Sequence, residues 1–581
     1  MLITVDTLRA DRLEPYGYQK IETPWIARLA ADGILFDRMI AQVPLTLPSH
    51  CSIMTGVYPI STMVRDQAGF VLADKQTTLA ESLRNVGYET AAFVASSVLD
   101  SRTGLSQGFD VYSAPTNDDG RTSVARESLE RRGDEIVAEA LKWMSAPGRK
   151  KFFVWIHLFD PHAPYKSPEP FASRYVQDPY DGEIAYVDSV LGTFLESGIA
   201  GGWYDKSLIW FTSDHGESLG EHGEESHGFF VYDSTLRVPS IVKLPLSHWK
   251  GTRVADQGRS VDVAPTILSL VGLKPGPEIQ GESLLSRIAR ETKVTDLVAY
   301  SETYFPYYHF EWSPLHSVCT RKYKYIKAPD PELYDLEMDP GEKTNLAVGN
   351  PDLCKRFSEQ LSAEYIGLAT ATPSRLETGD VADTKKLLSL GYVGMSRTAR
   401  NPPGADLPDP KNKISLYRLL QDALTASQDG RIEESTRKLQ QVLKQDDHII
   451  DAHLNLGVNY AGKGSFAKAA DAFRRVLELD DHNLLATFNL ALCYAQLGNL
   501  NDAIVGFRRT LELNPRETEA LVALGRSYQM QGEFAKASTA FRKAIDQQPN
   551  LAEAHGYLSE IYRAQGKENS ATREPNRLGP N

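Results

Sequence analysis

The sequence reads Phe211-Thr-Ser-Asp-His-Gly-Glu-Ser-Leu-Gly-Glu-His-Gly-Glu-Glu-Ser-His227-Gly at its most informative point, directly after the apolar run Leu208-Ile209-Trp210. The apolar run predicts a β-strand, which places Asp214 and His215 at its carboxyl end, where open α/β sheets build their sites. Neighbouring side chains diverge along a continuing strand, so both can ligate one ion only if the chain turns, and Gly216 permits that turn. The five acids and three histidines favour a metal site, although a solvated acidic loop also fits the stretch when it is taken alone.

Two other apolar runs lead to polar residues of the same kind. Met1-Leu-Ile-Thr-Val predicts a strand that delivers Asp6, and the run 151–158 predicts one that leads to Asp160 and His162. Alone, Asp6 is equally well explained as the N-cap of a helix, and a lone histidine is more often structural. Helices predicted between the strands, such as 76–86, indicate a mostly parallel sheet whose carboxyl edge gathers these groups.

Thr46 begins the segment Thr-Leu-Pro-Ser-His50-Cys51, which predicts a helix that ends at Gly56. The start of a helix presents free N–H groups and partial positive charge, which suit a phosphate or sulfate and a deprotonated hydroxyl. The alternative is that Thr46 is only an N-cap. Arg65 is interpreted as a ligand for an anionic substrate, with a structural salt bridge as the alternative.

Composition excludes several classes of protein. The net charge is -13 and there is no block of lysine and arginine, so no nucleic-acid partner is expected. The four cysteines show neither metal-type spacing nor a disulfide framework. No apolar run of about 20 residues is present, so no transmembrane segment is expected. The chain as it stands has no leader and indicates a cytoplasmic protein, whereas a missing upstream segment would allow an extracytoplasmic one.

The last third of the chain is a repeat with a period of 34 residues. The period predicts an all-α solenoid of four to five helix pairs that resembles the tetratricopeptide repeat. Such a solenoid presents a concave surface, so we expect a protein or peptide partner, with a plain spacer or oligomerisation stalk as the alternative. The residues that keep the period are Gly430, Gly464, Gly498, Gly532 and Gly566, with Tyr460, Tyr494, Tyr528 and Tyr562, and Phe473, Phe507 and Phe541.

These patterns divide the chain. We predict a catalytic core at 1–295, and a smaller antiparallel subdomain at 296–385 from the strand alternation after Arg321. A linker rich in proline and glycine is predicted at 386–413. The repeats then occupy 414–568, and a disordered tail is predicted at 569–581.

Positions 1 to about 395 resemble the sulfatase and alkaline-phosphatase superfamily. The resemblance implies a large α/β sandwich with a mostly parallel central sheet and a small carboxyl-terminal antiparallel subdomain. It rests on Val5-Asp-Thr-Leu-Arg-Ala-Asp-Arg, Thr46-Leu-Pro-Ser-His with Thr55-Gly56, His157 to His162, Thr212 to His222, Leu236-Arg-Val-Pro239, Glu332-Leu-Tyr-Asp-Leu, Asp339-Pro-Gly-Glu and Asn345-Leu.

The departures from the sulfatase pattern bear on the chemistry. A sulfatase begins Cys-x-Pro-Ser-Arg with a cysteine or serine that becomes formylglycine, whereas this chain has Thr46, and His50 in place of the arginine. Threonine cannot give that aldehyde and Cys51 has the wrong context, so no formylglycine is expected. Many sulfatases carry Gly-Lys-x-His where this chain has Ala95-Ser-Ser-Val. Asp214-His215 replaces an Asp-Asn pair and favours zinc or manganese over calcium, which remains an alternative.

The threonine and the Asp214-His215 stretch are similar to phosphoethanolamine transferases and to the nucleotide pyrophosphatase/phosphodiesterase branch. This resemblance implies that one metal is held by four residues, which are Asp6, Thr46, Asp214 and His215. It also implies that His162 and His227 contact the leaving group or a second metal, with Asp160 as a weaker ligand.

The predicted function is hydrolysis of a small anionic ester, with phosphate mono- and diesters favoured over sulfate esters. Thr46 is the predicted nucleophile, and His162 or His227 the proton donor. His50 and Arg65 are the predicted substrate ligands. The alternatives are a sulfatase, a phosphoethanolamine-type transferase, and a non-catalytic scaffold in which the repeats carry the function.

Overall fold

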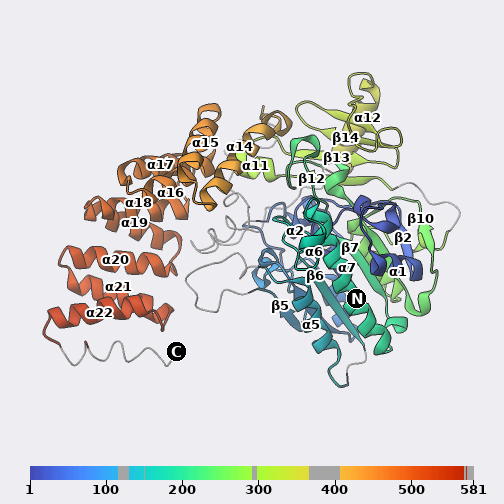
Figure 1. Cartoon of the computed structure of the whole chain (residues 1–581), viewed down its shortest axis with the longest axis horizontal. Coiled ribbons are helices and arrows are strands. Elements are labelled where there is room, and N and C mark those ends of the chain that lie inside the picture. The colour runs from blue at the N-terminus through green and yellow to red at the C-terminus, as the bar shows by residue number, and fades with distance from the viewer. Residues whose placement is uncertain are drawn as a thin grey trace. The chain divides into compact units, whose positions relative to one another are not determined.

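The computed structural model describes residues 1–67, 69–115, 130–148, 151–290, 297–365, 406–567 and 571 of the 581-residue chain. These residues form two compact units, one of the residues up to 365 with 406–414 and one of the residues from 415 on. Figure 1 shows the first unit as a mixed ribbon coloured blue to yellow and the second as orange and red helices. The predicted fold classes are confirmed: an α/β unit with a mostly parallel sheet, and an all-α repeat unit.

The first unit is built on an eight-stranded sheet in the order β10-β2-β9-β7-β1-β6-β4-β5. Strand β1 lies between β6 and β7 and runs parallel to both, so the carboxyl ends of these three strands meet at one edge. Strand β9 runs antiparallel to β7 and β2. The strands are β1 (Leu2–Val5), β2 (Ile34–Phe36), β4 (Glu89–Val94), β5 (Val111–Ser113), β6 (Phe152–Leu158), β7 (Ile209–Ser213), β9 (Ser240–Lys243) and β10 (Thr252–Val254).

Helices cover both faces of this sheet, which is why β1 is buried throughout. The Ile3 face packs against α1 (Pro24–Asp32), α5 (Gly133–Met144) and α7 (Pro179–Ala200) in one apolar cluster. On the Thr4 face, α2 (Thr46–Thr55) is joined to β1 by a hydrogen bond between His50 and Thr4. The other helices of the core are α3 (Pro59–Thr62), α4 (Leu79–Arg84), α6 (Phe171–Arg174), α8 (Asp233–Leu236), α9 (Val263–Leu270) and α10 (Leu285–Ile288).

Smaller sheets complete the first unit. One has the order β11-β3-β8, formed by Gly258–Arg259, Met39–Ile40 and Arg237–Val238. The other is the predicted antiparallel piece, with Tyr300, Val318 and Tyr325 packed against α12. It contains β12 (Ala299–Thr303), β13 (Leu315–Cys319), β14 (Tyr323–Lys327) and β15 (Glu332–Asp335), accompanied by α11 (Phe305–Phe310) and α12 (Pro351–Glu364).

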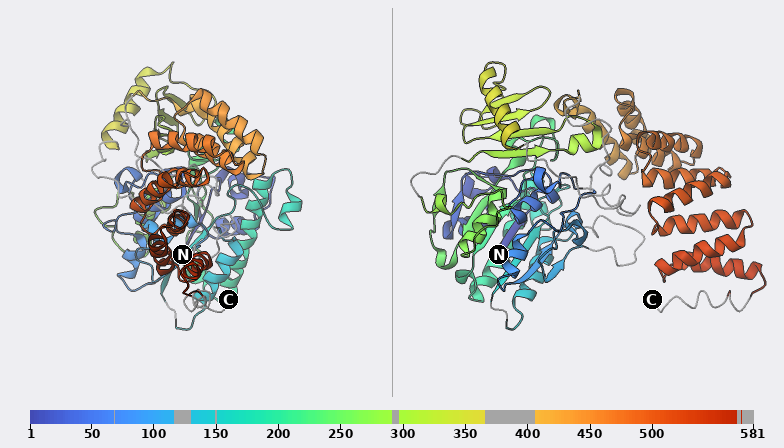
Figure 2. Two further views of the ribbon diagram at one scale, coloured as in Figure 1. Left: turned by 90° about the vertical axis from the view of Figure 1, so that its left-hand side faces the viewer. Right: turned by 180° about the vertical axis from the view of Figure 1, so that it is seen from behind.

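The second unit is a stack of antiparallel helix pairs, visible in both views of Figure 2. In two of the pairs a glycine of one helix packs against a phenylalanine ring of the next. A Cβ on Gly457 would lie 2.6 Å from the ring of Phe473, and one on Gly525 would lie 2.6 Å from Phe541. The helices are α14 (Pro410–Gln428), α15 (Ile432–Gln445), α16 (Ile450–Gly462), α17 (Phe466–Leu479), α18 (Leu484–Gln496), α19 (Leu500–Leu513), α20 (Thr518–Met530), α21 (Phe534–Gln547) and α22 (Ala552–Ala564).

Several predicted boundaries fall on parts of the chain without a description. The predicted linker 386–413 lies outside the described residues up to 405. Residues 406–414 belong to the first unit, where Ser313 N–H donates to the carbonyl of Pro408, and α14 begins at Pro410. The predicted tail 569–581 lies outside the described residues except for Ala571. Among the helices that are described, none is long and apolar enough to cross a membrane.

Candidate active site

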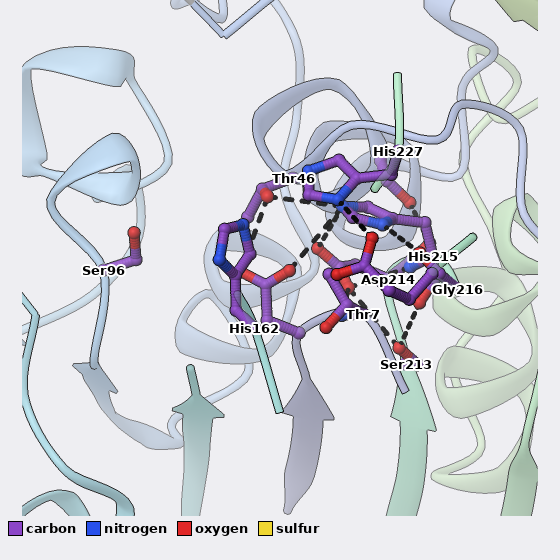
Figure 3. A network of polar contacts seen from close by, with 12 residues as sticks. Thr7, Thr46, Ser96, His162, Ser213, Asp214, His215, Gly216 and His227 are labelled. Carbon is purple, nitrogen blue, oxygen red and sulfur yellow. Dashed lines mark hydrogen bonds and ion pairs between the residues drawn. The ribbon is translucent and has the colours of Figure 1, made fainter. Parts of the chain in front are cut away.

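The candidate active site lies at the carboxyl edge of the central sheet. Asp6 follows β1, Asp214 and His215 follow β7, and Thr46 is the first residue of α2. Figure 3 shows Thr46, Asp214, His215 and His227 together above the ends of the strands. The structure therefore brings together residues that are far apart in the sequence, as the three strand endings predicted.

Asp6, Asp214 and His215 form a group that could hold a metal ion. One ligand atom from each lies within 4.8 Å of the others, and Nε2 of His215 is 3.6 Å from Asp6 Oδ1 and 3.5 Å from Asp214 Oδ2. All three residues are 0% exposed. Asp6 Oδ1 and Asp214 Oδ2 have no hydrogen-bond partner among the described residues. Because two buried carboxylates need a cation to offset their charge, this donor set fits a divalent metal ion.

The turn after β7 depends on close backbone contact. A Cβ on Gly216 would lie 2.2 Å from the carbonyl oxygen of Ser234, and Gly216 N–H donates to the carbonyl of Thr235 at 2.7 Å. His215 Nδ1 lies 2.9 Å from the carbonyl oxygen of Gly216, which makes Nδ1 the protonated nitrogen. Nε2 of His215 therefore presents its lone pair to the carboxylates, as a metal ligand must.

Thr46 directs its hydroxyl into the same group. Oγ1 lies 3.5 Å from Asp6 Oδ2 and 3.3 Å from His215 Nε2, and the residue is fully buried. The N-cap of α2 is Leu45, so the hydroxyl of Thr46 is not used to cap the helix. The geometry favours the nucleophile interpretation over the N-cap alternative.

His50 holds the backbone of Thr46 through a hydrogen bond. Its Nδ1–H donates to the carbonyl oxygen of Thr46 at 2.8 Å, and its Nε2 lies 3.0 Å from Oγ1 of Thr4, which accepts from Trp155 Nε1–H. Burial lowers the pKa of His50 to about 3, so the ring is neutral. Both ring nitrogens bond within the protein, so His50 positions the first turn of α2, and its ring has no further nitrogen for the predicted substrate contact.

Arg65 forms a buried ion pair within the protein, which is the structural alternative to a substrate contact. Its guanidinium pairs with Glu302, with Nε 3.1 Å from Oε1, and it lies 4.1 Å above the ring of Tyr304. The side chain is buried in this ion pair. The predicted substrate contact of Arg65 is not seen, since its charge is already matched.

His162 and His227 stand beside the metal group. The ring centroid of His227 is 4.5 Å from that of His215 and 5.1 Å from that of His162. His162 Nδ1 lies 2.8 Å from the carbonyl oxygen of Ala163, whereas His227 Nδ1 lies 3.1 Å from Glu217 Oε1. The two imidazoles therefore lie next to each other at the metal group.

Asp160 does not join this group. Its Oδ2 accepts from Gly133 N–H at 3.3 Å, and its carboxyl faces Glu183 on α7. Burial raises the pKa of both acids. Within the described residues, the only metal-type group is that of Asp6, Asp214 and His215. The second metal set predicted from Asp160, His162 and His227 therefore does not assemble, because Asp160 turns toward α5 and α7.

Two functional candidates were missed from the sequence. His157 on β6 pairs in register with Thr4, accepts from Ala95 N–H through Nδ1 at 3.3 Å, and points Nε2 at Asp6 Oδ2 from 3.7 Å. The signal was a histidine inside an otherwise apolar strand next to β1. Glu217 is the second, and nothing distinguished it from the other four acids of its loop. Ser96, where many sulfatases carry a charged group, lies apart from the network in Figure 3.

Burial dominates the electrostatics of the site. It raises the pKa of Asp6 to about 7, and it also raises the pKa of Asp214. Burial opposes protonation of His215, but the charges of Asp214 and Asp6 outweigh it and raise the pKa of His215. In the metal-free protein, protons therefore occupy the place that a cation would take.

Comparison with known proteins identifies both units. Residues 1–273 match the sulfatase family, and residues 220–366 match the carboxyl-terminal domain of N-sulphoglucosamine sulphohydrolase. Residues 420–483, 454–518 and 518–551 match tetratricopeptide repeats.

Characterised relatives match the first unit at low identity. The arylsulfatase of Clostridium perfringens is 24% identical, in an alignment that covers 60% of this chain and 89% of the relative. The multifunctional alkaline phosphatase superfamily protein PehA of Trinickia caryophylli is 23% identical, with 60% and 91% covered. The structure of a phosphonate monoester hydrolase of Agrobacterium radiobacter superposes with a TM-score of 0.55 at 20% identity, covering 69% of this chain and 99% of that one.

Residues 1–366 therefore belong to the sulfatase family within the alkaline-phosphatase superfamily, and tetratricopeptide repeats follow them. The protein is a hydrolase of this superfamily.

Proposed function

We propose that the first unit cleaves phosphate mono- or diesters by in-line attack of the Thr46 hydroxyl on phosphorus. The observation that carries the proposal is the place of Oγ1, at the start of α2 and within 3.5 Å of both Asp6 and His215. A nucleophile at a helix start, beside a cation-binding group, is what attack on an anionic ester requires.

The residues that would hold the metal are Asp6, Asp214 and His215, with Thr46 as the fourth ligand. The imidazole of His215 favours zinc or manganese over calcium. When bound, such an ion supplies charge stabilisation to the hydroxyl anion and to the ester oxygens.

The protein supplies the rest of the mechanism. Asp6 Oδ2, 3.5 Å from Oγ1, accepts the hydroxyl proton of Thr46, since Nε2 of His215 is assigned to the metal, and His50 fixes the backbone that carries this hydroxyl. Burial of the site excludes bulk water, which strengthens each electrostatic contact. His162 or His227 then protonates the leaving oxygen, and the phosphothreonine formed passes its phosphoryl group to water.

Two further candidates differ in substrate or acceptor. Sulfate ester hydrolysis is favoured by the sulfatase relatives, among them the Clostridium perfringens enzyme. Phosphate is our preference because Thr46 cannot become formylglycine and the Ala95-Ser-Ser-Val segment lacks the charged groups of many sulfatases. Transfer of the phospho group to an acceptor hydroxyl, as in phosphoethanolamine transferases, needs only a different second substrate.

We propose that the repeats bind a protein or peptide partner.

The test uses the purified full chain with zinc, manganese or calcium. Wild type and Thr46→Ala are assayed on an aryl phosphate monoester, an aryl phosphodiester and an aryl sulfate. We expect phosphate-ester turnover that needs zinc or manganese and is lost in Thr46→Ala. Sulfate turnover that survives in Thr46→Ala would overturn the mechanism.

A further inference from the structure

Glu217 is a buried acid whose carboxylate is aimed at His227. The residue is 0% exposed, and Oε1 lies 3.1 Å from Nδ1 of His227. Ser226 Oγ lies 3.2 Å from the same nitrogen. The contact between Glu217 Oε1 and Nδ1 fixes the plane of the imidazole ring and leaves Nε2 as the ring nitrogen that does not face Glu217.

The loop between these residues is closed in a way that fixes the pair. Ser218 N–H donates to the carbonyl of Ser226 at 2.8 Å, which joins the residues next to Glu217 and His227. On the other side, a guanidinium N–H of Arg9 donates to the backbone carbonyl of Glu217 at 3.0 Å. The backbone of Glu217 is thus tied to Arg9, and the backbone of the next residue is tied to Ser226, the residue before His227.

The orientation of His227 depends on this contact. Its ring centroid lies 4.5 Å from that of His215 and 5.1 Å from that of His162, and Figure 3 shows the ring above His215 and beside Thr46. With Nδ1 turned to Glu217, the opposite ring nitrogen faces the group that contains Thr46. The Nδ1 of His162 instead lies 2.8 Å from the backbone carbonyl oxygen of Ala163.

We propose that Glu217 is a positioning residue that holds His227 as the donor to the leaving group, and this rests on the proposed function. In the first step the proton of Thr46 Oγ1 passes to Asp6 Oδ2 as the bond from Oγ1 to phosphorus forms and the bond from phosphorus to the leaving oxygen breaks. The electron pair stays on the leaving oxygen, which takes a proton from Nε2 of a His227 ring that is protonated on both nitrogens, and Nδ1–H stays bonded to Glu217. In the second step a water oxygen bonds to phosphorus and the water gives a proton to Nε2, while the bond to Thr46 Oγ1 breaks and Oγ1 takes its proton back from Asp6.

The test compares two substrates that differ in their need for a proton donor. Phenyl phosphate has a poor leaving group, and dinitrophenyl phosphate has one that departs unaided. Glu217→Ala should lower kcat about 10- to 100-fold for phenyl phosphate, below the roughly 100-fold or more that a full donor contributes, and hardly at all for dinitrophenyl phosphate. Glu217→Gln, which keeps an acceptor oxygen, should recover much of the loss. In a His227→Ala background the Glu217 substitutions should have no further effect.

Glu224 provides the matched control. It is a buried carboxylate of the same loop, and it accepts from Phe229 N–H at 2.7 Å. Glu224→Gln should change the rates of the two substrates by the same factor. An equal loss for both substrates in Glu217→Ala, or a loss that persists without His227, overturns the inference.

A crystal structure of Glu217→Ala gives a readout that needs no substrate. We expect the ring of His227 to leave its place beside His215, whereas an unmoved ring contradicts the positioning role. If wild type shows no turnover that depends on Thr46, the proposed function fails and the proton-delivery part fails with it. If turnover depends on Thr46 but the leaving-group pattern is absent, only the inference about Glu217 fails.

Discussion

The metal group and the repeats place their charges in opposite ways. Asp6, Asp214 and His215 are fully buried, and two of their carboxylate oxygens lack a hydrogen-bond partner within the described part of the chain. In the repeats the ion pairs lie at the surface, as between Arg475 and Asp447. Their hydrophobic cluster is built from apolar side chains such as Phe473 and Phe507. The metal group instead gathers two carboxylates at one buried point, where a cation would offset their charge.

Thr46→Ala should have the largest effect. Removing the nucleophile should lower kcat by about 1000-fold or more, because no neighbouring side chain replaces the hydroxyl. Initial rates with the preferred ester, together with metal content, measure this. Thr46→Ser serves as the control, since it keeps the hydroxyl and should retain measurable turnover.

The second largest effect is expected from Asp214→Asn, which should weaken metal binding. It removes one of the two unpaired buried charges, so we expect metal affinity to fall by roughly 100-fold or more, beyond what outer contacts contribute. Asp160→Asn is the matched control, because Asp160 faces Gly133 and Glu183 and lies outside the metal group. Equal losses of metal in a titration of the two variants would contradict this assignment.

The pH dependence of stability should also separate the two units. In the metal-free protein burial raises the pKa of Asp6 from 3.8 to about 7, so over this window the unfolded chain has lost a proton that the folded protein still holds. Metal-free stability therefore falls as pH rises through the window, and the raised pKa of His215 acts in the same direction. Because a metal ion replaces these protons, the difference in Tm between metal-loaded and metal-free protein should grow from about pH 5 to about pH 8. A difference that shrinks over this range would contradict the site.

The smallest effect is expected in the repeats. Gly457→Ala places a Cβ 2.6 Å from the ring of Phe473 and should lower the free energy of unfolding by about 1–3 kcal/mol. Gly462→Ala, at the end of the same helix with no atom within 4 Å, should instead be neutral or stabilising by up to about 1 kcal/mol. Hydrogen exchange of α16 and α17 measures both, and equal protection in the two variants would contradict the packing. Ester turnover should not change in either.

The sequence predicted the repeats and the central sheet because both follow from periodicity. The 34-residue period specifies each helix pair, and three apolar runs that end in acids specify parallel strands that share an edge. The metal group was predictable for the same reason, since strand endings converge. The directions of the side chains were not predictable. Arg65 pairs with Glu302, and Asp160 contacts Glu183, and each partner lies more than 20 residues away in the chain. The position of His157 depends on the register between β1 and β6, and that of Glu217 depends on the closure of its loop. No local sequence pattern predicts either.

Rapid quenching of the reaction tests the central claim most directly. Wild-type protein loaded with zinc or manganese is mixed with an aryl phosphate, stopped in acid within the first turnover, digested and analysed by mass spectrometry. The account predicts one added phosphoryl group on the peptide that contains Thr46, and none in Thr46→Ala. Turnover of the ester without any modification of that peptide, or a phosphoryl group on another residue, would contradict it.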